Sequence, residues 1–244
     1  MRRSLLLTLF GVILFLVFAI AIWPASVAMS WLVPEGATFA GVTGTVWEGS
    51  ASQVRIGIVD VGRLRWEARP SSFLIGRPAW VLRADRGDGF ASGTVVLRGA
   101  SDVEASDLKV GATLQSLSAW VNLAGTAGNL SVDIPELRLQ SGQLSHFSGR
   151  AVVDSVKPMG LREVDLGSIE IEIPADQPGP FVGVVRTLES PLLIDQGRIE
   201  IQTNGQFLVE GLVAAKPDAP TEIVQGLQFL GQADSRGFRR FSQQ

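Results

Sequence analysis

Side chains that usually perform chemistry are scarce in this chain. His146 is its only histidine, and it contains no cysteine. Zinc sites are built from clustered histidine and cysteine ligands, and a hydrolase nucleophile elbow needs G-x-S-x-G, which occurs nowhere in the sequence. The lack of cysteine also excludes disulfides, Fe–S clusters and thiol nucleophiles. We therefore interpret His146 as a packed or surface residue of a strand.

The acidic residues also have plain structural interpretations. "DRGDG" at Asp85–Gly89 resembles the start of a calcium loop but lacks the spacing and closing glutamate of an EF-hand, so it predicts a turn. Glu170 and Glu172 stand two apart and share one face of a strand, which predicts the solvated side of an amphipathic strand rather than an acid/base pair. Phosphate-binding P-loop and dinucleotide-binding glycine patterns are absent. The sequence predicts no enzyme, no metal and no cofactor.

Overall charge argues against nucleic acid as a partner. The formal net charge is −3, and the six tryptophans are spread along the chain without clustered basic residues between them. Nucleic-acid binding requires a basic face, and single-strand binding adds aromatic rings to it. We expect no nucleic-acid partner.

An uncharged apolar segment, Ser4–Trp23, predicts a membrane anchor. About eighteen residues at 1.5 Å each span about 27 Å, close to the hydrocarbon thickness of a bilayer, and such a segment must be helical in lipid. Arg2 and Arg3 precede it, whereas the next basic residue is Arg55. The positive-inside rule then places the N-terminus in the cytoplasm.

Two alternatives to an anchor exist. "SVAM" at Ser26–Met29 offers a signal-peptidase site, although the apolar run exceeds the 7–15 residues of an ordinary signal peptide. A buried core helix is the second alternative. With an anchor, the expected organisation is a cytoplasmic tip at 1–3, a transmembrane helix at 4–23, a juxtamembrane segment at 24–40 and a periplasmic β domain at 41–244.

Beyond Pro34, alternation of apolar and polar residues predicts strands. The clearest examples are Val95–Arg98, Leu130–Gln140, Ser168–Pro174 and Gly197–Thr203. Asn204-Gly205 between two such runs is the strongest hairpin signal in the chain. With 27 glycines and 12 prolines between short runs, an antiparallel meander is favoured over βαβ units.

Two stretches predict short capping helices, namely Ser116–Trp120 and Pro220–Gln232, the second with Thr221 as its cap. We expect the second helix to cover one end of the sheet, since an open sheet must bury its apolar face. The predicted fold class is mainly β: a transmembrane helix followed by a long, curved antiparallel sheet, with a gutter-like half-pipe as one form it could take.

The region from Gly41 to Pro78 is the most distinctive. Gly44 and Gly49 frame Val46-Trp47, which predicts a glycine-framed strand, and Trp47 and Trp66 can supply apolar area to one core. The charged neighbours on either side of Trp66 would then point to the opposite face. Two ordinary hairpin strands explain the same pattern.

Two motifs stand out in this region. The first is Gly41, Gly44, Thr45, Val46, Trp47 and Gly49, and the second is Leu64, Trp66, Pro70, Phe73 and Leu74, followed by Gly76. Together they resemble protein N of the bacterial type II secretion system, with Gly76 one place earlier than the family spacing. The resemblance implies an inner-membrane, periplasm-facing accessory subunit for export of folded proteins, with other secretion subunits as partners and no catalytic residues. We expect the motif residues to pack the first hairpin.

A second resemblance keeps another function open. Related Gly-Thr-x-Trp strings occur in AsmA-like envelope proteins, whose β sheets form a gutter for lipids. A lipid-binding sheet would expose an apolar face, whereas a purely structural subunit would cover it. The expected face is formed by Val95, Leu97, Leu137, Leu139, Ile169, Ile171 and Ile173.

Overall fold

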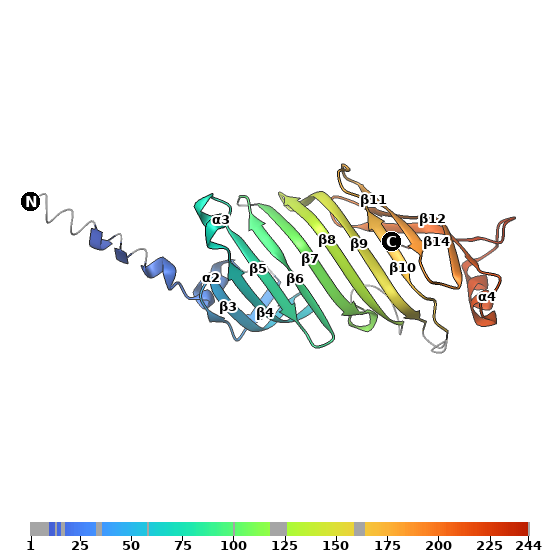
Figure 1. Cartoon of the computed structure of the whole chain (residues 1–244), viewed down its shortest axis with the longest axis horizontal. Helices are drawn as coiled ribbons and strands as arrows, with labels where there is room; N and C mark the ends of the chain where they lie inside the picture. The colour runs from blue at the N-terminus through green and yellow to red at the C-terminus, as the bar shows by residue number, and fades with distance from the viewer. Residues whose placement is uncertain are drawn as a thin grey trace, which may run out of the picture. The chain divides into compact units, whose positions relative to one another are not determined.

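A computed structural model of the chain shows a mainly β protein (Figure 1). It describes residues 10–12, 14–15, 18–32, 36–57, 59–99, 101–117, 126–158 and 164–243. For residues 30–32 and 117 it describes the backbone only. The described chain divides into two compact units, Met1–Arg86 and Gly87–Gln244, here called the N-terminal and C-terminal units.

The predicted anchor lies partly outside the described residues. Residues 10–12, 14–15 and 18–21 are helical. Within the described part of the chain, no single helix has both the length and the apolar character required to span a bilayer. The anchor at 4–23 therefore stays a prediction.

The N-terminal unit is a small antiparallel sheet with two short helices. Its elements are α2 (Ala25–Leu32), β1 (Ala37–Ala40), β2 (Thr43–Gly44), β3 (Glu48–Ile56), β4 (Val59–Ala68), α3 (Pro70–Leu74) and β5 (Ala79–Asp85). The strand order is β1-β3-β4-β5, and β2 pairs with β3 beyond the end of β1. The sequence had assigned no helix or strand to 24–40, where the structure has α2 and β1.

Helix α2 completes the core of this unit. The buried residues Ala25, Ala51, Val54 and Trp66 pack together, with Leu64 and Met29 partly buried against them. Ala25, Ala28 and Met29 recur at helical spacing, so α2 presents one apolar stripe. Trp66 is buried while its neighbours on either side are exposed, which confirms the predicted faces of β4.

The C-terminal unit is an antiparallel meander, as predicted (Figure 1). Its strands are β6 (Gly89–Leu97), β7 (Asp102–Thr113), β8 (Ala127–Gln140), β9 (Gln143–Lys157), β10 (Ile169–Ile173), β11 (Phe181–Thr187), β12 (Leu192–Ile201), β13 (Phe207–Ala215) and β14 (Arg239–Gln243). Each described strand pairs with the next in chain order. The four predicted strand segments overlap β6, β8, β10 and β12, three of them extending one or two residues beyond the observed strand.

The predicted hairpin turn and the predicted helix at 220–232 are confirmed, with one correction to the helix cap. Gly205 adopts φ 86° in the turn between β12 and β13, at the predicted Asn204-Gly205. The helix predicted at 220–232 is α4 (Thr221–Leu227) followed by η2 (Gln228–Leu230). Thr221 is not its cap, because Pro220 occupies that position and no side chain caps the helix. Of the other predicted helix, η1 (Leu114–Leu117) is present, and residues 118–120 lie outside the described part.

Apolar residues occupy one face of the C-terminal unit in cross-strand rows. One row runs through Leu97, Val103, Leu139 and Leu144, and a second through Val95, Ala105, Leu137 and Phe147. Among the described residues, helix α4 covers the end of this face through Ile223, and no second sheet layer packs on β6–β10. The sheet is therefore open.

On this face, Gly183 lets side chains of its two neighbouring strands pack together. A Cβ at Gly183 would lie 2.6 Å from Cγ1 of Ile173 and 2.9 Å from Cγ2 of Ile199. Because glycine has no side chain, the isoleucine side chains of both neighbouring strands lie over Gly183. Ile173 is buried in a cluster with Leu144, Phe181, Val185 and Ile199 of the same sheet.

Candidate functional site

The first motif forms a tight turn between β2 and β3, not the predicted glycine-framed strand. Gly44 has φ 90°, a conformation that side-chain-bearing residues rarely adopt. The hydroxyl oxygen of Thr45 accepts hydrogen bonds from the backbone N–H groups of Trp47 (3.3 Å) and Glu48 (3.2 Å). The side-chain oxygen of Thr45 therefore satisfies two backbone N–H groups within the turn, and this stabilises the turn.

Three indole N–H groups converge on this turn and on the helix before it. Trp47 Nε1 donates to the carbonyl oxygen of Ile20 at 2.9 Å. Trp66 Nε1 donates to the carbonyl of Thr45, and Trp80 Nε1 to that of Val46, each at 3.0 Å. A buried or half-buried indole N–H needs a hydrogen-bond acceptor. Here each acceptor is the backbone carbonyl of a residue that is distant in the sequence.

The turn also bonds the chain just after the N-terminal helix. The Val46 N–H donates to the carbonyl of Trp23 at 3.1 Å, and Pro24 forms an isolated antiparallel bridge with Thr45. The last carbonyls of a helix lack partners within the helix itself. Residues 45–47 therefore complete the end of the N-terminal helix and fix it to the first strands.

Aromatic packing holds the same turn from the other side. The ring of Phe73 lies 4.9 Å from that of Trp47 and 5.2 Å from that of Trp80, centroid to centroid. Phe73 sits on α3, which Pro70 begins at its first position, where the missing N–H costs nothing. We use the name tryptophan junction for three parts taken together: residues 20–24, the turn 45–47, and the side chains of Trp47, Trp66, Phe73 and Trp80.

The motif glycines allow the close approaches that the junction needs. A Cβ at Gly44 would lie 2.4 Å from the Glu48 carbonyl oxygen, and one at Gly49 would lie 2.4 Å from the ring of Trp66. Gly41 has φ 61° and lies against the side chain of Ser52. Each glycine is required by space, by backbone conformation or by both.

The predicted site residues thus come together, with some additions. Gly44, Thr45, Trp47, Gly49 and Trp66 meet in or against the turn, Pro70 starts the helix that carries Phe73, Leu64 packs in the core and Gly41 lies in the preceding loop. The sequence did not indicate Trp80 or the acceptor carbonyls of Ile20 and Trp23. The only signal for Trp80 in the sequence was its residue type, a tryptophan near the start of a strand.

The acidic pair of β10 differs in part from its prediction. Glu170 and Glu172 share a face and both contact Arg186, and Arg150 also pairs with Glu170. Both glutamates lie on the polar face of the strand as predicted, but Glu170 is only 1% exposed because the two arginines cover it, so this position is not solvated. The hydrogen bond from Arg186, supported by Arg150, lowers the pKa of Glu170 despite its burial.

His146 also lies in a strand, as predicted, 3.5 Å from Glu136 across the sheet. Among the residues that the structure describes, no three histidine, cysteine or acidic side chains gather as a metal site would require.

Comparison with known proteins identifies the family. A family model described as "Type II secretion system (T2SS), protein N" matches residues 35–242.

The chain belongs to this family. The type II secretion system protein N of Aeromonas hydrophila is 27% identical over 97% of this chain and 96% of its own length. The protein N of Vibrio cholerae serotype O1 is 26% identical over 91% of this chain and 90% of its own length. No solved structure matches the chain significantly. The resemblance drawn from the two motifs is confirmed, and both motifs lie within the part that the protein N model matches.

Proposed function

We propose that this chain is a non-enzymatic accessory subunit of the type II secretion apparatus, taking part in export of folded proteins across the outer membrane. Residues 4–23 anchor it in the inner membrane with the N-terminus in the cytoplasm. The part from residue 24 onward faces the periplasm and binds other subunits of the inner-membrane platform or the periplasm. It needs no cofactor.

Membership of the protein N family is the observation that carries this proposal. The tryptophan junction supports the tether, because hydrogen bonds from Trp47 and Val46 hold the carbonyls of Ile20 and Trp23. A sheet fixed at the end of an apolar helix cannot move far from the bilayer. That arrangement suits a subunit which holds other components at a set distance.

Topology can be tested with single cysteines, because the natural chain has none. One variant carries Ser101→Cys, at an exposed position of the C-terminal unit, and a second carries a cysteine inserted after Met1. A membrane-impermeant maleimide applied to cells with a permeabilised outer membrane should label the first variant only. Labelling of both before lysis, or of neither, contradicts the proposed topology.

The role in secretion is tested by deletion and complementation. A strain lacking the chain should release less secreted enzyme into the medium, and the full chain should restore release. In-cell crosslinking should recover secretion subunits with the chain. Unchanged secretion together with no such crosslinks would refute the proposal.

The open apolar face of the C-terminal unit favours lipid binding as a second candidate function. Leu97 is 39% exposed, and most of its row partners are only half-buried. Phospholipid recovered in near-stoichiometric amount with the crosslinked chain, without secretion subunits, would favour the AsmA-like function. Secretion subunits recovered without lipid would favour the subunit proposal.

A further inference from the structure

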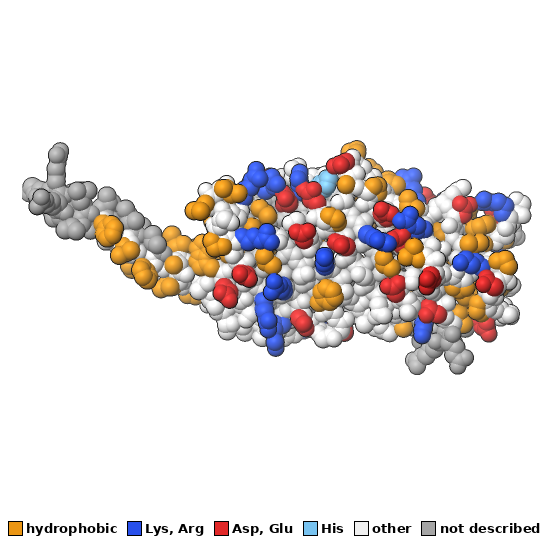
Figure 2. Space-filling model, viewed as in Figure 1, with side chains coloured by type: hydrophobic (Ala, Val, Ile, Leu, Met, Phe, Trp, Pro, Cys, Tyr) orange, Lys and Arg blue, Asp and Glu red, His pale blue; other side chains and the backbone are white. Residues whose placement is uncertain are grey.

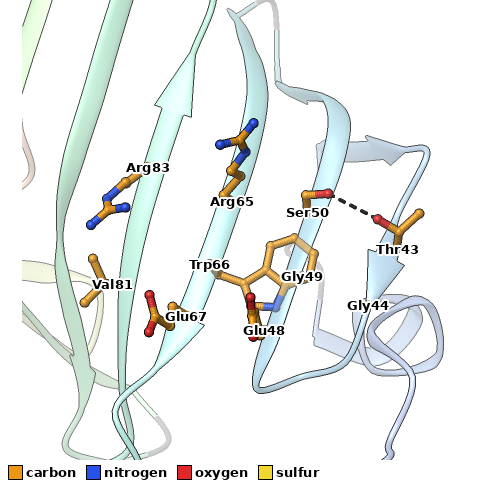
Figure 3. Close-up of a pocket in the computed structure, with 10 residues that line it drawn as sticks. All are labelled: Thr43, Gly44, Glu48, Gly49, Ser50, Arg65, Trp66, Glu67, Val81 and Arg83. Carbon is orange, nitrogen blue, oxygen red and sulfur yellow. Dashed lines mark hydrogen bonds between the residues drawn. The ribbon is translucent and has the colours of Figure 1, made fainter.

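Four hydrogen-bond donors form one straight cross-strand row in the N-terminal unit. Thr43 of β2 lies opposite Ser50 of β3, Ser50 lies opposite Arg65 of β4, and Arg65 lies opposite Arg83 of β5. Directly opposed residues of antiparallel strands share a face of the sheet. Figure 3 shows these four side chains in order across the strands. We call them the donor row.

A second row of opposite charge runs beside the donor row. Glu48 of β3 lies opposite Glu67 of β4, which lies opposite Val81 of β5. Both glutamates are two residues from members of the donor row, Ser50 and Arg65, and therefore point to the same face. Figure 3 shows Glu48 and Glu67 on neighbouring strands, next to the residues of the donor row. We call Glu48 and Glu67 the acceptor row.

This arrangement places like charges opposite each other. Arg65 faces Arg83, and Glu48 faces Glu67, and such pairs destabilise a sheet. All four side chains are exposed, and within the described residues none makes an ion pair. The N-terminal unit therefore retains an electrostatic conflict that its own strands do not resolve.

The C-terminal unit shows the usual solution to the same problem. There Glu104 pairs with Arg98 and Arg138, Glu170 pairs with Arg150 and Arg186, and Glu210 pairs with Arg240 across strands. Figure 2 shows acidic and basic side chains interspersed on this unit. The like-charged rows are thus a local departure from the pattern of this chain.

The two rows line a single open cavity of about 500 Å³. Thr43, Ser50, Arg65, Arg83, Glu48 and Glu67 all border it, together with Gly44, Gly49, Trp66 and Val81. Its volume lies within the usual range of small-molecule sites. Unpaired charges of both signs therefore meet in a space that a small charged group can enter.

We propose that this cavity binds a zwitterionic phosphate ester, with the phosphate on the donor row and a primary ammonium on the acceptor row. Arg65 and Arg83 stand at opposed positions of neighbouring strands, and a guanidinium fork matches a phosphate, because it offers parallel N–H donors to the phosphate oxygens. Thr43 and Ser50 hydrogen-bond each other at 3.1 Å, so one hydroxyl hydrogen of the pair remains for the ligand. The ammonium would relieve the repulsion between the two carboxylates.

The spacing of the rows selects the ligand further. Same-face residues two apart in a strand are separated by about 6.8 Å. An α-amino acid joins its α-ammonium and α-carboxylate through a single carbon, which is too short for both rows. A phosphate ester of ethanolamine has a longer link and extends from one row to the other. The same group occurs free and as a phospholipid headgroup.

Binding can be measured on the full chain in a non-ionic detergent or a nanodisc. The probes are free phosphoethanolamine, inorganic phosphate, and nanodiscs of phosphatidylethanolamine, phosphatidylcholine or phosphatidylglycerol. Titration calorimetry serves for the soluble probes, and protection from hydrogen exchange in β2–β5 serves for the lipids. Free phosphoethanolamine that binds as well as the lipid would identify a soluble source, whereas binding only in the bilayer would identify the headgroup.

Charge-neutral variants of both rows test the assignment. Arg65→Gln with Arg83→Gln should weaken phosphoethanolamine binding about tenfold or more, because it removes two charge-assisted contacts. Glu48→Gln with Glu67→Gln should leave binding of inorganic phosphate intact and remove the preference for ethanolamine over choline. Arg55→Gln, an exposed arginine of β3 away from the cavity, is the matched control and should bind normally.

The thermal midpoint separates misfolding from lost binding. Both double variants should melt at or above the wild-type temperature, because each relieves a like-charge pair. The proposal is overturned if the arginine variant binds as wild type does, or if no probe binds the wild-type chain. Equal binding of choline and ethanolamine headgroups overturns the role given to the acceptor row.

Discussion

The indole nitrogen of Trp47 donates a 2.9 Å hydrogen bond to the carbonyl oxygen of Ile20, twenty-seven residues earlier in the chain. Ile20 is in the last turn of the N-terminal helix, and Trp47 ends the turn between β2 and β3. The bond therefore joins the segment expected in the membrane to the start of the sheet. It gives the Gly-Thr-x-Trp motif a physical role beyond packing.

This role predicts a graded response at Trp47. Trp47→Phe keeps the ring against Phe73 but removes the donor, and should lower the unfolding free energy by about 1 kcal/mol. Trp47→Ala also removes the ring packing and should cost about 3 kcal/mol. Urea denaturation followed by circular dichroism measures both changes.

Limited proteolysis adds a local readout for the same variants. Trp47→Phe should speed subtilisin cleavage within residues 20–25, identified by mass spectrometry. Trp80→Phe, which removes a donor to Val46 rather than to Ile20, is the control and should speed that cleavage less. Equal cleavage of Trp47→Phe and the wild type would show that the bond does not hold the helix end.

A second prediction concerns the space at Gly44. Gly44→Ala should destabilise the chain by about 3 kcal/mol, because it combines a positive φ with a Cβ 2.4 Å from a backbone oxygen. Gly76 has φ 70° with no atom near its Cβ position, so Gly76→Ala isolates the conformational cost and should lose about 1 kcal/mol. Similar losses in thermal unfolding would mean that the turn yields to the added methyl group.

A third prediction concerns the pH dependence of stability at Glu170. Its pKa is lowered in the folded state, chiefly by the hydrogen bond from Arg186. Its ionised form therefore stabilises the fold above the unfolded-state pKa of about 4.3, and this contribution is lost as pH falls through the lower folded pKa.

Glu170→Gln should accordingly lower the melting temperature near neutral pH, with a shrinking difference from wild type below about pH 4. Glu172→Gln is the matched control on the same strand and face; it also loses a contact to Arg186, but its side chain is 52% exposed. We expect a smaller effect there. A difference at Glu170 that stays constant down to pH 2 would assign it to shape rather than charge.

A fourth prediction tests how helix α4 covers the sheet end. Ile223 is 4% exposed against Val213 and Leu192, whereas Val224 is 45% exposed. Ile223→Ala should cost about 3 kcal/mol, and Val224→Ala less than about 1 kcal/mol. Equal values in a denaturant series would mean that α4 does not dock as the structure shows.

Local patterns in the sequence determined part of the sheet. Alternation with period two predicted β6, β8, β10 and β12, because one face of each strand is apolar and the other polar. The Asn204-Gly205 pair predicted the turn between β12 and β13, since few other residue pairs adopt the backbone conformation of a tight hairpin turn. The two motifs between Gly41 and Gly76 together indicated the family. Each of these signals acts over a few residues.

Only the tertiary structure decided where the distant groups meet. The partners of the three indoles lie 27, 21 and 34 residues away, and no local rule selects a carbonyl at that separation. Glu170 is buried because arginines from the two neighbouring strands extend over it, which its own alternating strand does not reveal. The donor row likewise exists only through the register of four strands, because registration, not sequence spacing, brings Thr43, Ser50, Arg65 and Arg83 into one line.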